Sequence, residues 1–214
     1  IGTADNNTTS ITLGDIDADG DLDVIAGNNG QTNNLYLNDG SAVFTAGAVI
    51  GAADNTNSIT LGDIDADGDL DVIAGNGSSN GQANMLYLNN GNGAFTAGTA
   101  IGTDTDNTYS ITLGDIDADG DLDVIAGNYS DVTTNKLYLN DGSGGFSDAT
   151  GAAVGTADTT RSITLGDIDG DGHLDVIAGN YSQTNTLYLN DSSDGFSGAE
   201  ISADIARTYS ITLG

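Results

Sequence analysis

Apolar residues occur in short runs bounded by Gly, Asn and Asp, and the same order of runs returns along the chain. In the first unit the runs are Ile11–Leu13, Leu22–Ala26, Leu35–Leu37 and a weaker one at Phe44–Ile50. They are rich in Ile, Val, Leu and Tyr and too short for helices, which predicts four β-strands per unit. The turn sequence Asn38-Asp39-Gly40 separates the third strand from the fourth.

The repeat is the dominant feature of the sequence. The segment SITLG begins at Ser10, Ser58, Ser110, Ser162 and Ser210. It predicts repeats over 10–57, 58–109, 110–161 and 162–209, and the start of a fifth over 210–214. Four short antiparallel strands in about 50 residues are typical of a β-propeller blade. We therefore expect an all-β fold in which residues 1–214 form a single array of four propeller-type blades plus the first strand of a fifth.

The apolar pattern also predicts how the blades pack. The run Leu22–Ala26 is apolar on both faces, which suits a sheet stacked between two others. One Tyr and one Phe recur in each unit, and we expect them to pack between blades. These residues are Tyr36, Tyr87, Tyr138 and Tyr188, and Phe44, Phe95, Phe146 and Phe196.

Charge narrows the classes of partner. The chain has 32 acidic and three basic residues, for a formal net charge of −29. Such a chain is repelled by nucleic acid and by anionic membranes, so neither is an expected partner. The chain has no Cys, which excludes disulfides and thiolate metal sites. No apolar run is long enough to insert into a membrane. Cations are its natural counter-ions.

The acidic residues concentrate in one loop of each unit. Residues 15–23, 63–71 and 115–123 read DIDADGDLD, and residues 167–175 read DIDGDGHLD. Alternate carboxylates in a tight loop repel one another unless a cation lies between them, and Ca²⁺ prefers such hard oxygen ligands. We predict one Ca²⁺ in each loop. The predicted side-chain ligands, at loop positions one, three, five and nine, are Asp15, Asp17, Asp19, Asp23, Asp63, Asp65, Asp67, Asp71, Asp115, Asp117, Asp119, Asp123, Asp167, Asp169, Asp171 and Asp175.

The seventh loop residue is predicted to bind through its backbone carbonyl. It is Asp21, Asp69, Asp121 or His173, and the single histidine falls where the side chain is not needed. An EF-hand is rejected because it requires flanking helices and an acidic residue at loop position twelve. That position is alanine in all four loops (Ala26, Ala74, Ala126, Ala178).

The loop, together with LDVIAGN, LYLN and a following Phe, resembles the FG-GAP/VCBS repeat family. That family includes the calcium-binding blades of integrin alpha subunits and many bacterial surface proteins. The resemblance covers essentially the whole chain. It implies four-stranded blades with calcium held between the first and second strands. Family propellers usually close with about seven blades, whereas this chain has four and a fragment, so the sequence does not decide between a closed ring and an open array.

The sequence favours a calcium-stabilised extracellular or cell-surface protein with a structural or adhesive role. No enzymatic activity is expected, because no nucleophile–base pair or P-loop is present. A carbohydrate-binding, lectin-like propeller is the alternative, with Tyr129 and Tyr181 in loops as candidate platforms and glycans as partners. An integrin-like protein-binding head has less support, because the variable loops consist mostly of Gly, Ser, Thr and Asn. Six asparagines begin N-x-[ST] sequons: Asn6, Asn7, Asn76, Asn128, Asn180 and Asn190.

The end of the sequence leaves three architectures open. Residues 201–214 are in phase with residues 1–14, including the extra SITLG. The chain is then a segment of a longer propeller, an open stack, or a subunit whose last strand pairs with another copy head to tail in a filament.

Overall fold

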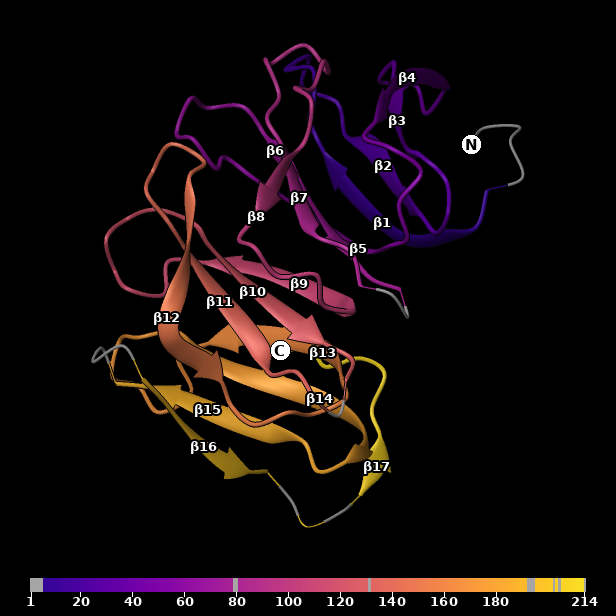
Figure 1. The fold of residues 1–214 in the computed structure, drawn as a ribbon. Coiled ribbons are helices and arrows are strands. Elements are labelled where there is room, and N and C mark those ends of the chain that lie inside the picture. Colours follow the sequence, from indigo (N-terminus) through magenta and orange to yellow (C-terminus); the bar gives the residue numbers. More distant parts are fainter. Residues whose placement is uncertain are drawn as a thin grey trace.

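The computed structural model describes residues 6–78, 81–130, 132–191, 195–201, 203 and 205–213, with the side chains of 148–152 and 206 excepted. All strands in these ranges are antiparallel, and they form four sheets that follow one another in chain order (Figure 1). The residues described include no helix, and hence none long and apolar enough to cross a membrane. The prediction of an all-β, blade-like fold is therefore confirmed.

Each sheet contains four consecutive strands. The first contains β1 (Thr8–Gly14), β2 (Asp23–Asn28), β3 (Asn33–Asn38) and β4 (Phe44–Ile50). The second contains β5 (Thr56–Gly62), β6 (Asp71–Asn76), β7 (Asn84–Tyr87) and β8 (Thr99–Ile101). The third contains β9 (Thr108–Gly114), β10 (Asp123–Asn128), β11 (Asn135–Asn140) and β12 (Phe146–Val154). The fourth contains β13 (Thr160–Gly166), β14 (Asp175–Gln183), β15 (Thr186–Asn190) and β16 (Phe196–Glu200), and β17 (Ala206–Arg207) also pairs with β14.

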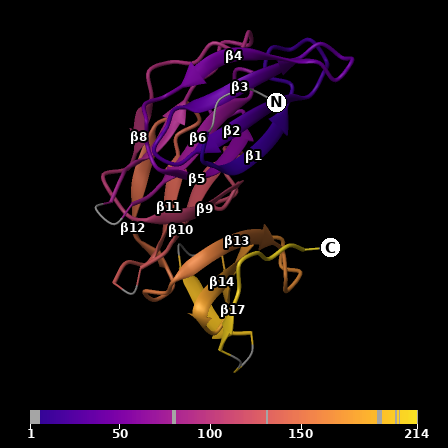
Figure 2. The ribbon, with the colours of Figure 1, turned by 90° about the vertical axis from the view of Figure 1, so that its right-hand side faces the viewer.

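The first strands of the four sheets lie side by side along the array. Strand β1 contacts β5, β5 contacts β9, and β9 contacts β13. Figures 1 and 2 show the first sheet at one end of this open stack and the fourth sheet at the other. One hydrogen bond repeats at each step, since the amide of Ile59 donates to Ser10 Oγ and that of Ile111 to Ser58 Oγ.

Each hydrophobic core lies between two successive sheets rather than inside one. Ile25 and Leu35 of the first sheet pack against Val72 and Tyr87 of the second, and all four are at most 2% exposed. Equivalent residues fill the next two interfaces. Successive strand residues point to opposite faces, so a sheet with neighbours on both sides needs the two-faced apolar run found in the second strand. The recurrent Tyr87, Tyr138 and Tyr188 lie in these cores, as predicted.

The ends of the array show what a neighbouring sheet contributes. Ile11 in β1 is 65% exposed, whereas its equivalents Ile59 and Ile111 are each 7% exposed. At the other end, the amide of Ile211 donates to Ser162 Oγ at 3.0 Å, the same contact that Ile163 makes with Ser110. The predicted first strand of a fifth unit therefore sits where a next blade would begin. Residues 208–213 are extended along the fourth sheet through this contact but do not form a strand.

Candidate metal centres

Each aspartate loop connects the first strand of a sheet to its second strand, so all four loops lie at the same ends of the first strands. The chain must curl tightly at two points in the loop. Ala18 has φ 59° and Gly20 has φ 95°, and the fourth loop places glycine at both points, Gly170 (φ 82°) and Gly172 (φ 94°). A left-handed residue without a Cβ is unstrained. The loop glycine therefore has the predicted turn role.

The loop curvature brings three aspartates of each loop together. Their carboxylate oxygens lie within 4.8 Å of one another. The triads are Asp15, Asp17 and Asp19; Asp63, Asp65 and Asp71; Asp115, Asp117 and Asp123; and Asp167, Asp169 and Asp175. The other predicted side-chain ligands, Asp23, Asp67, Asp119 and Asp171, lie in the same loops but outside these triads.

The ninth loop residue is fixed by the sheet itself. Asp23 is fully buried, and its carboxylate accepts hydrogen bonds from the amides of Ile16 at 2.9 Å and Asn38 at 2.8 Å. The equivalents Asp71, Asp123 and Asp175 are also fully buried and accept the same pair of bonds. One donor comes from the loop and the other from the end of the third strand. The position of this carboxylate is therefore set before any ion binds.

Several carboxylate oxygens in the loops are buried without a hydrogen-bond donor. They are Oδ1 of Asp17, Asp63, Asp65 and Asp115. Burial, and then the neighbouring aspartates, raise the pKa of Asp17, Asp65 and Asp117. Burial raises the pKa of Asp71 and Asp123 to about 6. Crowded anionic oxygens that the protein leaves unpaired fit a hard divalent cation, and Ca²⁺ is bound by six to eight such oxygens.

The side chain of the seventh loop residue lies against a turn of the same sheet. A Cβ on Gly40 would lie 2.5 Å from Oδ2 of Asp21, and Gly91 and Gly142 stand in the same relation to Asp69 and Asp121. These carboxylates are outside the triads. Binding through the backbone carbonyl, predicted for this position and for His173, stays a prediction that this placement favours.

Two other groups of predicted residues take a different place from the one expected. Tyr181 belongs to strand β14 rather than to a loop, and both it and Tyr129 contact Arg161. The sequon residues Asn76, Asn128 and Asn180 are at most 1% exposed, and each accepts a hydrogen bond from a threonine hydroxyl of the first strand. They are structural residues that a glycosylating enzyme could not reach in the folded chain.

Sequence reasoning missed the asparagine that ends each LYLN segment. The amide group of Asn89 donates to the backbone oxygen of Ile16, in the loop of the preceding sheet, at 2.9 Å. Asn140 and Asn190 make the same bond to Ile64 and Ile116. The first three aspartate loops are thereby tied to the next sheet. The recurrence of this asparagine in every unit was the signal, because a turn alone does not require it.

Comparison with known families gives three matches to one model, described as an FG-GAP-like repeat. The matched residues are 15–74, 63–126 and 117–178. Each match begins in one aspartate loop and extends into the second strand of the next sheet. No significant sequence match was found among curated proteins.

Solved structures with a similar fold have little sequence in common with the chain. The crystal structure of BBS1N in complex with ARL6DN, soaked with mercury, aligns at 8% identity with a TM-score of 0.60. The alignment covers 92% of this chain and 55% of that one. The V. cholerae biofilm matrix protein Bap1 aligns at 15% identity with a TM-score of 0.50, over 89% of this chain and 30% of that one. This chain therefore spans about half, or less, of the proteins that it matches, and the likeness is one of fold.

Proposed function

Because the chain belongs to the FG-GAP-like repeat family, we propose that it is a calcium-stabilised repeat protein of the cell surface or extracellular space, with a structural or adhesive role. Each loop would hold one Ca²⁺ through its aspartates and the carbonyl of its seventh residue. The observation that carries this proposal is the set of buried carboxylate oxygens without donors at Asp17, Asp63, Asp65 and Asp115. Folding places these oxygens among the other carboxylates of the first, second and third loops, and a cation bound in each loop would compensate them.

The expected stabilisation is large for a chain of this size. A ligand that binds only the folded state contributes about 1.4 kcal/mol per site when its free concentration is tenfold above the dissociation constant. Four sites then contribute about 5–6 kcal/mol, which is comparable to the whole stability of an ordinary domain. The first three loops are also hydrogen-bonded to the next sheet, so ordering these loops would stabilise the interface as well as their own sheets.

The proposed location follows from the same ion. Extracellular calcium modules have dissociation constants of about 10⁻⁴–10⁻³ M, a range that suits the calcium concentration outside cells. A fold shared with a biofilm matrix protein, and a family that includes surface proteins, support this location. A fold shared with a protein crystallised in complex with a partner supports a binding role. Head-to-tail association of copies, and glycans as partners, remain proposals.

Calcium removal tests the proposal directly. We expect the thermal midpoint, followed by circular dichroism at 217 nm as is usual for β-sheet proteins, to fall steeply when excess chelator replaces millimolar calcium. Magnesium at the same concentration should restore little of the midpoint, because Mg²⁺ loses its water ligands reluctantly. Calorimetric titration of the chelated protein should give about four sites. An unchanged midpoint in chelator would overturn the proposal.

A further inference from the structure

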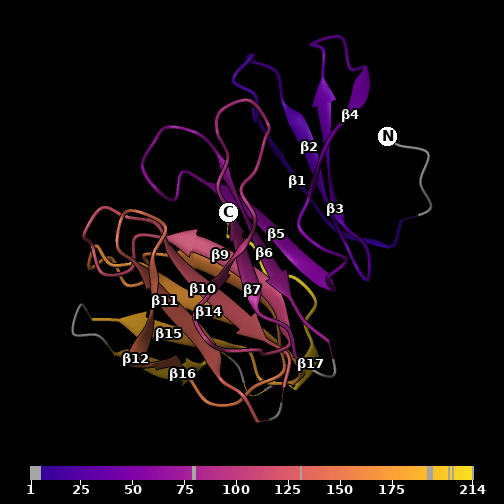
Figure 3. The ribbon, with the colours of Figure 1, turned by 45° about the horizontal axis from the view of Figure 1, so that its top comes forward.

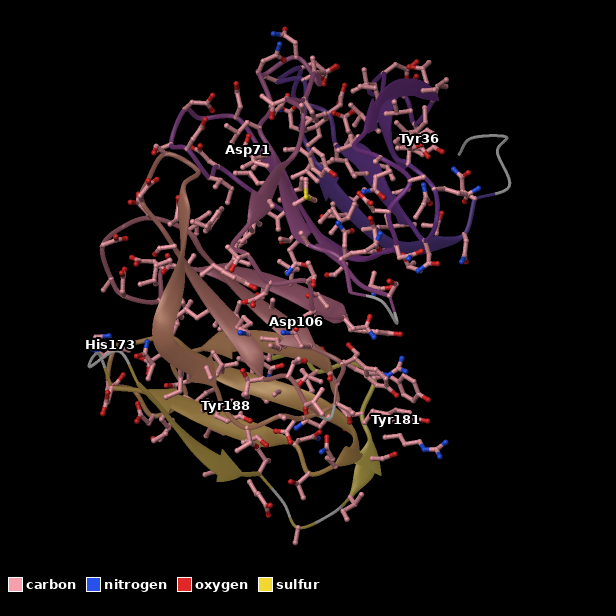
Figure 4. All side chains as sticks on the ribbon, viewed as in Figure 1. Tyr36, Asp71, Asp106, His173, Tyr181 and Tyr188 are labelled. Atoms are coloured by element: carbon pink, nitrogen blue, oxygen red, sulfur yellow. The ribbon has the colours of Figure 1, made fainter. Side chains whose placement is uncertain are left out.

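A cluster of aromatic rings around one arginine lies at the opposite end of the first strands from the aspartate loops. The guanidinium carbon of Arg161, near the start of β13, lies 4.9 Å from the ring centroid of Tyr109 and 4.6 Å from that of Tyr129. It lies 4.9 Å from Tyr181 and 5.2 Å from Tyr209. We call these five residues the Arg161 cluster. Figure 4 shows Tyr181 at one end of the fourth sheet and His173, of the fourth loop, at the other end.

The rings of the cluster also contact one another across three successive repeats. The centroids of Tyr109 and Tyr129 are 4.9 Å apart, those of Tyr129 and Tyr181 are 6.0 Å apart, and those of Tyr181 and Tyr209 are 5.8 Å apart. Tyr209 is 61% exposed. The cluster is therefore a continuous aromatic surface with a cation at its centre and an exposed ring at its rim. Such cation–π contacts favour the charged guanidinium without neutralising it.

Among the residues that the structure describes, no carboxylate forms an ion pair with Arg161, although the chain is rich in acids. Of the three basic residues, Lys136 pairs with Asp104 at 3.1 Å, and Arg207 lies 5.1 Å from the ring of Tyr181. Two of the three positive charges therefore lie at this one cluster. Within the described ranges the guanidinium of Arg161 lies against four tyrosine rings, and its buried Nε has no acceptor. Its donors suit a carboxylate, which guanidinium groups bind in a planar, bidentate manner.

A polar recess of about 360 Å³ adjoins the cluster at Tyr129. It lies between the second and third sheets, and its lining includes Asp106, Asn107, Ser130 and Thr133. The Thr133 hydroxyl is buried and has no hydrogen-bond partner. A recess with one aromatic wall and several carboxylate, amide and hydroxyl groups can bind a ligand that has both a flat apolar face and many hydroxyls. A pyranose ring has both.

We propose that the Arg161 cluster and this recess bind a sugar that carries one carboxylate, of the uronic acid class, within an otherwise neutral glycan. The guanidinium would bind the carboxylate, the tyrosine rings would stack on the pyranose, and the recess would accept its hydroxyls. A net charge of −29 repels a partner with many negative charges. That repulsion favours a single sugar acid over an acidic peptide or a polyanion. This inference rests on the adhesive part of the proposed function, for which it names a ligand class.

The test compares two sugars that differ at one carbon. The full chain in saturating calcium is titrated with D-galacturonic acid and with D-galactose, and binding is followed by ligand saturation-transfer NMR and tyrosine fluorescence. We expect millimolar affinity for galacturonate and at least about tenfold weaker binding of galactose, since a bidentate charged pair is lost. Arg161→Gln should reduce galacturonate binding to the galactose level, and Arg161→Lys should recover only part of it.

Two further variants keep the test decisive if the loss of Arg161 harms folding. Tyr209→Ala removes an exposed ring and should weaken galacturonate binding several-fold. Thr9→Ala, at the same strand position in β1 of the first sheet, which does not line the recess, should leave the binding unchanged. Equal binding of both sugars, or no effect of Arg161→Gln in a folded protein, would overturn the inference. So would glutarate binding as tightly as galacturonate, because the occupant would then be an acidic side chain. Calcium-dependent melting of the same variants reports separately on the proposed function.

Discussion

The two ends of the first strands carry opposite chemistry and vary in opposite ways from sheet to sheet. At the loop end, the nine loop residues are the same in the first three units and nearly the same in the fourth. At the other end, the second residue of the strand is Thr9, Asn57, Tyr109 or Arg161 in successive sheets, and Tyr209 follows in the same position. Figure 3, turned by 45° from the view of Figure 1, shows the sheets following one another from β1–β4 to β13–β16.

This contrast separates what a repeat must keep from what it can change. At the loop end of every sheet, the same residue types hold the crowded carboxylates in place. At the other end the contact to the next sheet is made in several ways. Asn57 donates to the backbone oxygen of Thr108 at 2.8 Å, whereas the later sheets stack tyrosine rings on Arg161. Specific recognition is therefore expected at the variable end.

The largest expected effect comes from the buried ninth loop residue. Asp123→Asn should lower the free energy of unfolding in calcium by about 3 kcal/mol, because a ligand is lost and a buried amide loses its acceptor. Asp121→Asn, whose side chain lies outside the triad, is the matched control and should change it by less than about 0.5 kcal/mol. In chelator, Asp123→Asn should lower the free energy of unfolding by less than it does in calcium, because the substitution also removes a buried charge that no ion then compensates. Equal effects of the two variants in denaturant titrations would refute this role for Asp123.

The pH dependence of stability should reverse when calcium is removed. The pKa of Asp71 and of Asp123 is raised to about 6 by burial. An acid whose pKa is higher in the folded state binds its proton more tightly there, so the calcium-free protein should lose stability as the pH rises from about 4 to 6. With calcium the trend should be opposite, since the ion binds only the deprotonated carboxylates. Urea unfolding at several pH values, in chelator and in calcium, measures both slopes.

A smaller loss is expected at the aromatic end, and it should not depend on calcium. Arg161→Gln removes contacts with four rings and should destabilise the chain by about 1–2 kcal/mol, given about 0.5–1 kcal/mol for an exposed cation–π pair and incomplete additivity. Arg207→Gln removes one exposed pair and should cost about 0.5 kcal/mol or less. Thermal melts in calcium and in chelator should show the same differences. A calcium-dependent loss would mean that the two ends are coupled.

The smallest effect is a gain of stability in the loops. Ala66 has φ 57°, a conformation that disfavours any side chain with a Cβ. Ala66→Gly should therefore stabilise the protein by up to about 1 kcal/mol. The gain is reduced by the greater conformational entropy that glycine gives the unfolded chain. Gly170→Ala, the reverse change in the fourth loop, should destabilise it by a similar amount. Opposite signs in these two melting shifts are the expected result, and equal signs would contradict the strain argument.

The local pattern was enough to predict most of the fold. The run Phe44–Ile50 is strand β4 to the residue, and Ile11–Leu13 lies within β1, because strand period and turn residues act over a few neighbours. The bounds of the other strands differ by one or two residues at their ends, where polar residues such as Asn28 and Asn33 continue the hydrogen-bonded ladder. The pattern of apolar residues does not predict strand ends that are polar.

What the sequence alone determined is the repeat, the all-β class and the acidic loops, since each depends on residues close together in the chain. Only the tertiary structure decided which aspartates converge, that Asn76 and Asn128 are buried, and that Tyr109, Tyr129, Tyr181 and Tyr209 surround Arg161. These contacts join residues from different strands and different sheets. They depend on how one sheet is placed against the next, and no local pattern of polar and apolar residues encodes that placement.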